Sequence, residues 1–319
     1  MKQIVIGVDI GGTFTKFGLV DRQGNVLLEG SMPTDIHDNV EDYQKGLYKE
    51  IEEAIAPIKS TIEIKGIGVG APNGNYYKGT IEFAPNLKWK GVIHFADLFK
   101  KYYNIPIVLT NDANAAGIGE GLYGGAKGMR DYIIITLGTG LGSGIVSNGE
   151  MIYGFDGFAG ELGHVIAEPN GRQCGCGRQG CLETYASATG MKRTAFELMC
   201  NMTEDSELRK YNFSDLTSEK IYEAAKRNDP IALKAFEYTG FILGAKLADA
   251  VAITTPEAIF LFGGLAKAGE LLFKPTRESF ENHLLNIYRD KIKILPSGLQ
   301  DKNIAVLGAA ALIWKELDK

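Results

Sequence analysis

Short apolar runs, separated by glycine or polar turns, alternate along the chain with segments of helical periodicity. A buried-strand pattern covers residues 3–9, the chain turns through Gly11-Gly12, and strand patterns follow over residues 15–20 and 26–28. Residues 40–58 then place apolar side chains three and four positions apart, which predicts an amphipathic helix. Strands that alternate with helices in this way are typical of an α/β fold.

The rest of the chain continues this alternation. Short apolar strands are predicted over residues 64–69 and 105–109, and another over residues 258–262. A long helix is predicted to begin at Pro230, because proline suits the first helical position, and the segment 303–317 is predicted to be the last helix. Both halves of the chain therefore have the alternation of strands and helices that is typical of α/β domains.

The opening arrangement of strand, glycine turn, strand, polar turn and strand occurs a second time. It returns with a strand over residues 132–137, a glycine turn over 138–142 and a strand over 143–146. This repeat predicts two related α/β domains, each with a glycine turn. We expect a smaller domain of residues 1–115, completed by the last helix at about 303–319, and a larger domain of residues 116–302.

Composition and charge exclude several classes of protein. Glycine makes up 40 of 319 residues, well above the usual share of about 7%, but no three-residue period accompanies it. The net charge is −5 and no basic block stands out, which argues against a nucleic-acid partner. No apolar run approaches the ~18 residues of a membrane span, and the N-terminal run stops at Asp9, too early for a signal peptide. A cytoplasmic location is expected.

Residues of the first glycine turn are candidates for binding phosphate and a metal ion. Asp9-Ile10-Gly11-Gly12-Thr13 lies between two strands, so it is neither a dinucleotide fingerprint nor a Walker loop, both of which lead into a helix. Glycine amides in such a turn can contact phosphate oxygens, and Thr13 and Thr15 would add hydroxyl donors. Asp9 could hold Mg²⁺ through water. A plain hairpin with a surface aspartate remains an alternative.

The second glycine turn, over residues 138–142, disfavours the interpretation of the first turn as a plain hairpin. Two glycine turns of this kind could hold successive phosphates of one nucleotide, and a third strand–glycine junction, Gly263-Gly264, could approach its adenosine end.

Three cysteines and one histidine form a compact motif. His164 is followed by Cys174, Cys176 and Cys181, a Cys₃His set that matches a closed tetrahedral zinc site. A disulfide or unpaired buried thiols are the alternatives, and a reducing compartment disfavours the disulfide. Four protein ligands leave no position for water, so the zinc is expected to be structural. Cys200 is expected to be a core residue.

Several carboxylates and amides could act on a substrate. Asn111-Asp112 ends an apolar strand and begins a helix of small residues, so Asp112 is either a helix cap or a general base for a hydroxyl nucleophile. Glu161 and Glu183 flank the cysteine motif, which brings both near one place, and carboxylates there suit sugar hydroxyls.

These motifs together resemble a known family. Glycine hairpins on duplicated α/β domains resemble the actin-like ATPase superfamily, whose ribonuclease H-like fold has a cleft between two domains. Asp9-Ile10-Gly11-Gly12-Thr13, the segment 137–142 and the cysteine motif are similar to those of the ROK family (repressor, open reading frame, kinase). The similarity runs from residue 4 to about residue 310.

The resemblance implies an ATP-dependent hexose kinase, with glucose converted to glucose 6-phosphate as the best expectation. Asp112 would be the general base, and Mg²⁺ and structural Zn²⁺ the metals. The expected sugar contacts are Asn86, Asn111, Asp112, Glu161, His164 and Glu183, with His164 using its other ring nitrogen for zinc. The expected nucleotide-binding residues are Asp9, Gly11, Gly12, Thr13, Thr15, Lys16, Gly138, Thr139, Gly140, Gly142, Gly263 and Gly264. For Asn86, a turn residue after Pro85 is the alternative.

Other substrates and roles stay open. Kinases of N-acetylmannosamine or N-acetylglucosamine and fructokinases have the same family pattern. Family members that act as sugar-responsive repressors have an added helix-turn-helix domain, whereas only eight residues precede Asp9, so this role is not expected. A sugar sensor without catalysis is also disfavoured, because both turns and both aspartates are present. The family pattern favours a homodimer.

Overall fold

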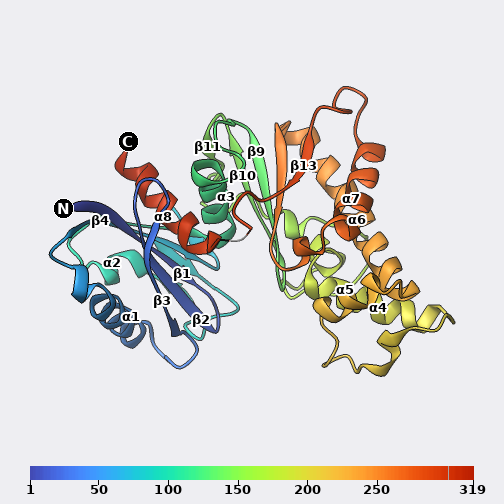
Figure 1. The fold of residues 1–319 in the computed structure, drawn as a ribbon, viewed down its shortest axis with the longest axis horizontal. Helices are drawn as coiled ribbons and strands as arrows, with labels where there is room; N and C mark the ends of the chain where they lie inside the picture. Colours follow the sequence, from blue (N-terminus) through green and yellow to red (C-terminus); the bar gives the residue numbers. More distant parts are fainter. Residues whose placement is uncertain (301) are drawn as a thin grey trace. The chain divides into compact units, whose positions relative to one another are not determined.

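A computed structural model describes residues 1–300 and 302–319, which form two compact units (Figure 1). The first unit contains residues 1–129, 144–160 and 298–319, and the second contains residues 130–143 and 161–297. The boundary expected after residue 115 would cut a helix that the structure keeps whole in the first unit. The segment 144–160 also belongs to the first unit rather than to the second.

The first unit is built on a five-stranded sheet in the order β3-β2-β1-β4-β8. Its strands are β1 (Lys2–Ile10), β2 (Phe14–Val20), β3 (Val26–Pro33), β4 (Ile62–Ala71) and β8 (Ile107–Asn111). The first three form an antiparallel meander, and β4 and β8 run parallel to β1. A small second sheet has the strands β5 (Gly74–Asn75), β6 (Thr80–Glu82) and β7 (Val92–Ile93).

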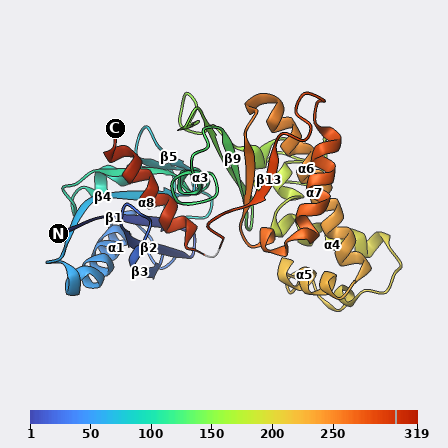
Figure 2. The same cartoon turned by 45° about the horizontal axis from the view of Figure 1, so that its top comes forward.

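The helices of the first unit cover both faces of its sheet (Figure 2). They are α1 (Val40–Ile55), which continues into the 3₁₀ turn η1 (Ala56–Ile58), α2 (Phe95–Phe99), α3 (Asp112–Tyr123) and α8 (Ile304–Leu317). On one face, α1 buries Tyr43 and Leu47 in the same core as Ile6 and Val8 of β1. Strand residues alternate between the two faces, so Gly7 points to the other side.

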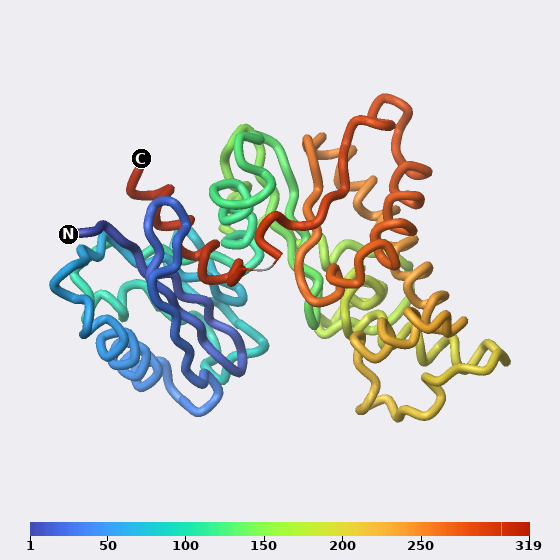
Figure 3. The backbone as a smooth tube through the Cα atoms, viewed as in Figure 1, coloured from blue at the N-terminus to red at the C-terminus, as the bar shows by residue number. Residues whose placement is uncertain are grey.

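Glycines on that other face let α8 approach the sheet closely. A Cβ placed on Gly7 would lie 2.2 Å from the Val306 carbonyl oxygen, and one on Gly68 would lie 1.8 Å from that of Ala309. Neither position has room for a side chain. In Figure 3, the red C-terminal helix accordingly returns to lie against the blue N-terminal strands.

The second unit is built on a sheet in the order β11-β10-β9-β12-β13. Its strands are β9 (Tyr132–Leu137), β10 (Leu141–Ser147), β12 (Ala258–Phe262) and β13 (Lys293–Pro296); β10 runs on into the first unit, where β11 (Glu150–Met151) pairs with it. The strand β12 is parallel to both β9 and β13.

Helices dominate the remainder of the second unit. They are α4 (Ala188–Asn201), α5 (Ser218–Lys226), α6 (Pro230–Thr254) and α7 (Glu270–His283), with 3₁₀ turns η2 (Leu162–His164), η3 (Leu182–Thr184), η4 (Glu207–Lys210) and η5 (Leu265–Ala268). Gly240 and Gly244 of α6 lie against the backbone of α7, so these two helices pack closely.

The predicted α/β fold is confirmed, and so are most elements. The strand over residues 258–262 has the predicted bounds, and α6 begins at Pro230 as predicted. The repeated strand–turn–strand arrangement appears as β1-β2-β3 and β9-β10-β11, although β11 is only two residues long. Among the described residues, no helix has the length and apolar character that crossing a bilayer requires.

Candidate functional site

The first glycine turn joins β1 to β2 through residues 11–13. In β1, Asp9 pairs with Lys16 of β2, and the last residue, Ile10, pairs with Thr15. The Gly11 N–H then donates to the Phe14 carbonyl at 3.0 Å, which closes the turn around Gly12 and Thr13. Thr13 and Lys16 are both exposed, so each is available to a ligand of this turn.

Asp9 and Asp112 lie on either side of Gly70 in β4. A Cβ on Gly70 would be 3.9 Å from Asp9 Oδ1 and 3.6 Å from the Asp112 Cα. Asp112 is the first residue of α3, where the Asn111 side chain caps the helix by accepting from the Ala113 N–H at 2.9 Å. A carboxylate at this end of a helix is stabilised by the helix dipole. The fold therefore brings both predicted carboxylates together within the first unit.

The two carboxylates titrate unusually. Burial, and then the negative charge of Asp112, raise the pKa of Asp9 to about 7, while Lys16 opposes the shift. Asp112 keeps access to solvent, yet desolvation raises its pKa too, against the hydrogen bond that it accepts from the Ala113 N–H at 2.8 Å. A pair of carboxylates that resist joint ionisation suits a divalent cation, whose charge would offset the repulsion.

Thr15 does not face this site, so its predicted role as a nucleotide ligand is wrong. Its side chain is fully buried, and its hydroxyl lies 2.8 Å from the Thr34 hydroxyl and 2.7 Å from the Tyr43 hydroxyl. The cause is strand alternation, which turns Thr15 inward with Phe17 and Leu19 of β2.

Asn86 lies beside the first glycine turn. A Cβ on Gly12 would be 2.7 Å from the Asn86 carbonyl oxygen and 3.2 Å from the Asn86 Cβ. The Asn86 side chain is exposed, and the residue follows Pro85 in a turn. Both interpretations of Asn86 therefore agree with the structure, since the turn is what carries this amide to the glycine turn. Nearby, Trp89 is buried against Tyr43 in the core of the first unit.

The second glycine turn lies at one edge of the sheet in the second unit. It follows β9, and Gly263-Gly264 follow the neighbouring parallel strand β12, so both leave the sheet at the same edge. Gly263 has a φ of 108° and no space for a Cβ, which would lie 2.5 Å from the Leu137 carbonyl oxygen. Gly138 and Thr139 are exposed at the turn. The structure thus places the two predicted glycine segments side by side.

The four predicted zinc ligands form one cluster. The ligand atoms of His164, Cys174, Cys176 and Cys181 all lie within 4.8 Å of one another. The sulfurs of Cys176 and Cys181 are 3.6 Å apart, and Cys174 Sγ is 3.8 Å from His164 Nδ1. All four cysteines of the chain are free thiols, so the alternative disulfide is not formed.

The cluster fits zinc in donor type and in size. Ligands at the usual Zn–S distance sit at tetrahedral corners about 3.8 Å apart, close to the separations observed here. Burial alone would raise the pKa of Cys176, but hydrogen bonds from the Arg178 backbone and from neighbouring thiols lower it to about 7. A thiol that ionises near neutrality is suited to binding a cation.

The side chain of Glu183 and the backbone of Glu161 contact members of this cluster. The His164 N–H donates to the Glu161 carbonyl at 3.0 Å. Glu183 Oε1 accepts from the Cys174 thiol at 3.0 Å and lies 3.8 Å from His164 Nδ1. Since Nδ1 faces the cysteines, the other nitrogen of His164 is left for a different partner, as the predicted double role requires.

Arg172 anchors the cysteine loop, a role that sequence reasoning missed. Its buried guanidinium pairs with Glu197 and donates to the carbonyls of Thr184 and Gly190. Only the proximity of Arg172 to Cys174 in sequence pointed to such a role. Cys200, in contrast, is exposed on α4, so its predicted place in the core is wrong.

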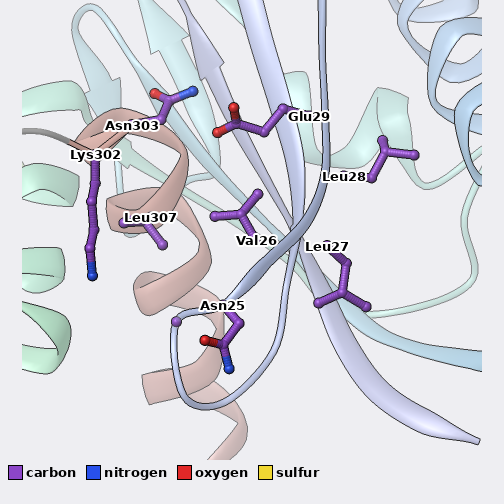
Figure 4. A pocket seen from close by; sticks show the side chains of 9 residues that line it. Asn25, Val26, Leu27, Leu28, Glu29, Lys302, Asn303 and Leu307 are labelled. Carbon is purple, nitrogen blue, oxygen red and sulfur yellow. The ribbon is translucent and has the colours of Figure 1, made fainter.

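A separate cavity of about 610 Å³ lies on the first unit, away from these residues (Figure 4). It is lined by the turn and strand that follow β2 and by the start of α8: Gly24, Asn25, Val26, Leu27, Leu28, Glu29, Lys302, Asn303 and Leu307. None of the predicted site residues lines it, so it takes no part in the candidate site.

Comparison with known proteins identifies the class. Residues 5–316 match the ROK family, and the chain belongs to this family. It is 34% identical to a glucokinase of Halalkalibacterium halodurans over 88% of this chain and 86% of that protein. It is also 30% identical to a xylose repressor of Caldicellulosiruptor bescii, over 98% of this chain and 78% of the repressor.

A solved structure of another family member is similar to this chain along nearly its whole length. The crystal structure of a ROK family glucokinase from Streptomyces griseus, in complex with glucose and AMPPNP, has a TM-score of 0.80 and 34% identity to this chain. The similarity covers 97% of this chain and 98% of that one. The predicted family and the predicted fold are therefore confirmed.

Proposed function

We propose that this chain phosphorylates glucose with ATP and gives glucose 6-phosphate and ADP. The observation that carries the proposal is the Asp112 carboxylate, held at the start of α3 beside Asp9, in a chain similar along its length to a glucokinase that binds glucose and AMPPNP. Phosphoryl transfer needs little more than positioning, charge neutralisation and a base for the alcohol proton.

Asp112 would act as the general base. Its carboxylate accepts the proton of the primary hydroxyl of glucose, whose oxygen attacks the γ-phosphorus while the bond to the bridging oxygen of ADP breaks. A raised pKa suits this role, since a base works best when its pKa approaches the working pH. Asn111 caps α3 and so holds the backbone of Asp112, the first residue of that helix, in position.

The remaining site residues divide into two sets by their chemistry. The glycine turns, with Asp9, Thr13, Lys16 and Thr139, would bind the phosphates, and Mg²⁺ held near Asp9 would offset their charge. The hydroxyls of the sugar would be bound by Asn86, Asn111, Glu161, His164 and Glu183. Thr15 is left out, because its hydroxyl is bonded in the core.

A structural zinc ion would be held by His164, Cys174, Cys176 and Cys181. The ion would fix the cysteine loop and leave Glu183 and the second nitrogen of His164 for the sugar. Metal analysis should find about one equivalent of zinc per chain. The homodimer implied by the family stays a prediction, and sedimentation equilibrium of the purified chain would test it.

A panel of sugars tests the function. ADP formation is measured with glucose, N-acetylmannosamine, N-acetylglucosamine, fructose and xylose, and we expect the highest kcat/KM for glucose. Xylose matches glucose around the ring but has no hydroxymethyl group, so it should not be phosphorylated. A higher kcat/KM for an N-acetylhexosamine would assign the chain to that substrate within the same reaction class.

A sugar-responsive regulator is the second candidate, because the chain is also similar to a xylose repressor. Such a protein would bind xylose or another sugar without consuming ATP. Sugar binding with no sugar-dependent ADP formation would favour this function over the kinase.

A further inference from the structure

The segment that follows the cysteine motif holds the second glycine turn from one side. The Ala188 N–H, at the start of α4, donates to the Gly138 carbonyl at 2.9 Å. Glu183 lies against the same turn, since a Cβ on Gly140 would be 2.7 Å from Glu183 Oε2. The other oxygen of Glu183 accepts from the Cys174 thiol at 3.0 Å. One carboxylate thus contacts both the turn and the metal cluster.

The segment that carries His164 holds the turn from a second side. The Leu162 N–H donates to the Ser143 hydroxyl of β10 at 3.1 Å. Gly163 is buried so tightly against β10 that a Cβ would lie 2.2 Å from the Leu141 carbonyl oxygen. Leu141 lies within the glycine turn and Ser143 directly follows it, so η2 packs against the end of the turn.

The metal cluster joins these two segments. His164 ends η2, and Cys181 immediately precedes η3, which contains Glu183. The Leu182 N–H also donates to the Val165 carbonyl at 2.9 Å, so one backbone hydrogen bond already links the segments. Coordination of His164 and Cys181 by one ion would add a much stronger link at the same place.

We propose that the bound metal holds the Gly138–Gly142 turn in its nucleotide-binding conformation, so that loss of the metal weakens binding of the nucleotide itself. This inference rests on the proposed function, in which that turn binds phosphate. The metal would then affect nucleotide binding at a distance, because in the proposed function neither the metal nor its four protein ligands contacts the nucleotide. Gly163 and Glu183 are then positioning residues for the turn.

Binding of the Mg²⁺ complex of AMPPNP, measured by calorimetry without sugar, tests the proposal. Cys176→Ser removes one exposed ligand, and we expect it to lose zinc and to bind AMPPNP about tenfold more weakly or worse, a common size of coupling between two sites. Cys200→Ser is the matched control, because Cys200 is an exposed cysteine outside the cluster. It should keep the zinc content and the AMPPNP affinity of the parent. Chelation of the parent protein should weaken binding likewise, and added zinc should restore it.

Gly163→Ala gives a second test that leaves every metal ligand in place. Its methyl group would meet the Leu141 carbonyl, so we expect weaker AMPPNP binding at an unchanged zinc content. This variant decides the matter if Cys176→Ser does not fold. Parent-like AMPPNP affinity in the zinc-free Cys176→Ser protein, or in Gly163→Ala, would overturn the proposal. Failure of the zinc-loaded parent to bind AMPPNP at all would instead overturn the proposed function, and this inference with it.

Discussion

Asp9 and Asp112 are electrostatically coupled across Gly70: burial, and then the charge of Asp112, raise the pKa of Asp9 to about 7. The two residues are about a hundred positions apart in sequence, and parallel pairing of β1, β4 and β8 brings them together. A cation between them would relieve the repulsion. If Asp9 holds Mg²⁺ and Asp112 is the base, as proposed, this electrostatic coupling is a physical reason for the two to be neighbours.

Replacement of Asp112, the proposed base, should lower turnover strongly and leave glucose binding intact. In Asp112→Asn the amide keeps the size of the side chain but cannot accept the proton, so kcat should fall by about 10²–10⁴-fold. The dissociation constant of glucose, measured by calorimetry, should change little. Asp215→Asn, an exposed aspartate of the second unit, serves as the control. Turnover near the parent level in Asp112→Asn would show that Asp112 is not the base.

The pH dependence of catalysis should reflect the raised pKa of Asp112. The base must be ionised to accept a proton, so kcat/KM should fall as the pH drops below its pKa. Because desolvation raises that pKa, the acidic limb should lie above the range of an ordinary aspartate, which is about 3.9. A rate profile from pH 4 to pH 9, with glucose and ATP varied, measures it. A flat profile down to pH 4 would contradict this expectation.

Packing of α8 against glycine should be intolerant of a single methyl group. Gly68→Ala would place its Cβ in the Ala309 carbonyl, so we expect the free energy of unfolding to fall by about 2–3 kcal/mol. Gly138→Ala is the control, since a Cβ there meets no atom within 4 Å. Urea denaturation measures both. Equal stability of the two variants would mean that α8 does not pack as described.

A buried aspartate in the first unit, Asp21, should make the free energy of unfolding fall at low pH. Burial alone would raise the pKa of Asp21, but hydrogen bonds from Lys2 and Asn25 lower it to about 2. A depressed pKa contributes stability above pH 4 that is lost as the pH falls toward 2. Since Lys2 is half exposed, the contribution is about 1–2 kcal/mol.

Asp21→Asn tests this link by urea denaturation at two pH values. It should be less stable than the parent at pH 7 and should approach the parent at pH 2.5. Asp35→Asn, an exposed aspartate, is the control and should follow the parent at both values. A deficit of the same size at both pH values in Asp21→Asn would contradict the assignment.

The sequence was sufficient where local pattern decides the structure. Periodicity predicted β12 and α6, and residue type with spacing predicted the four members of the metal cluster, because these features depend on near neighbours. Two errors could have been avoided in the same way. Thr15 alternates with Phe17 along β2 and so points inward, and Cys200 lies off the face of α4 that buries Met191 and Ala195.

The remaining features depend on contacts between distant segments. The domain boundary falls beyond α3 because this helix packs on α8, with Gly119 against Gly308, and no local pattern reports such a contact. Gly140 was predicted to bind phosphate, but the need to leave room for Glu183 appears only in the structure. The close approach of Gly163 to the Leu141 carbonyl likewise appears only in the structure.

The proposed reaction transfers the γ-phosphate of ATP to the primary hydroxyl of glucose. The most direct measurement is identification of the product by ³¹P and ¹³C NMR after the purified chain has been incubated with glucose, ATP and Mg²⁺. We predict one sugar phosphate, esterified at carbon 6, in amounts equal to the ADP formed. Phosphate at another position, or ADP with only inorganic phosphate, would contradict the proposed reaction.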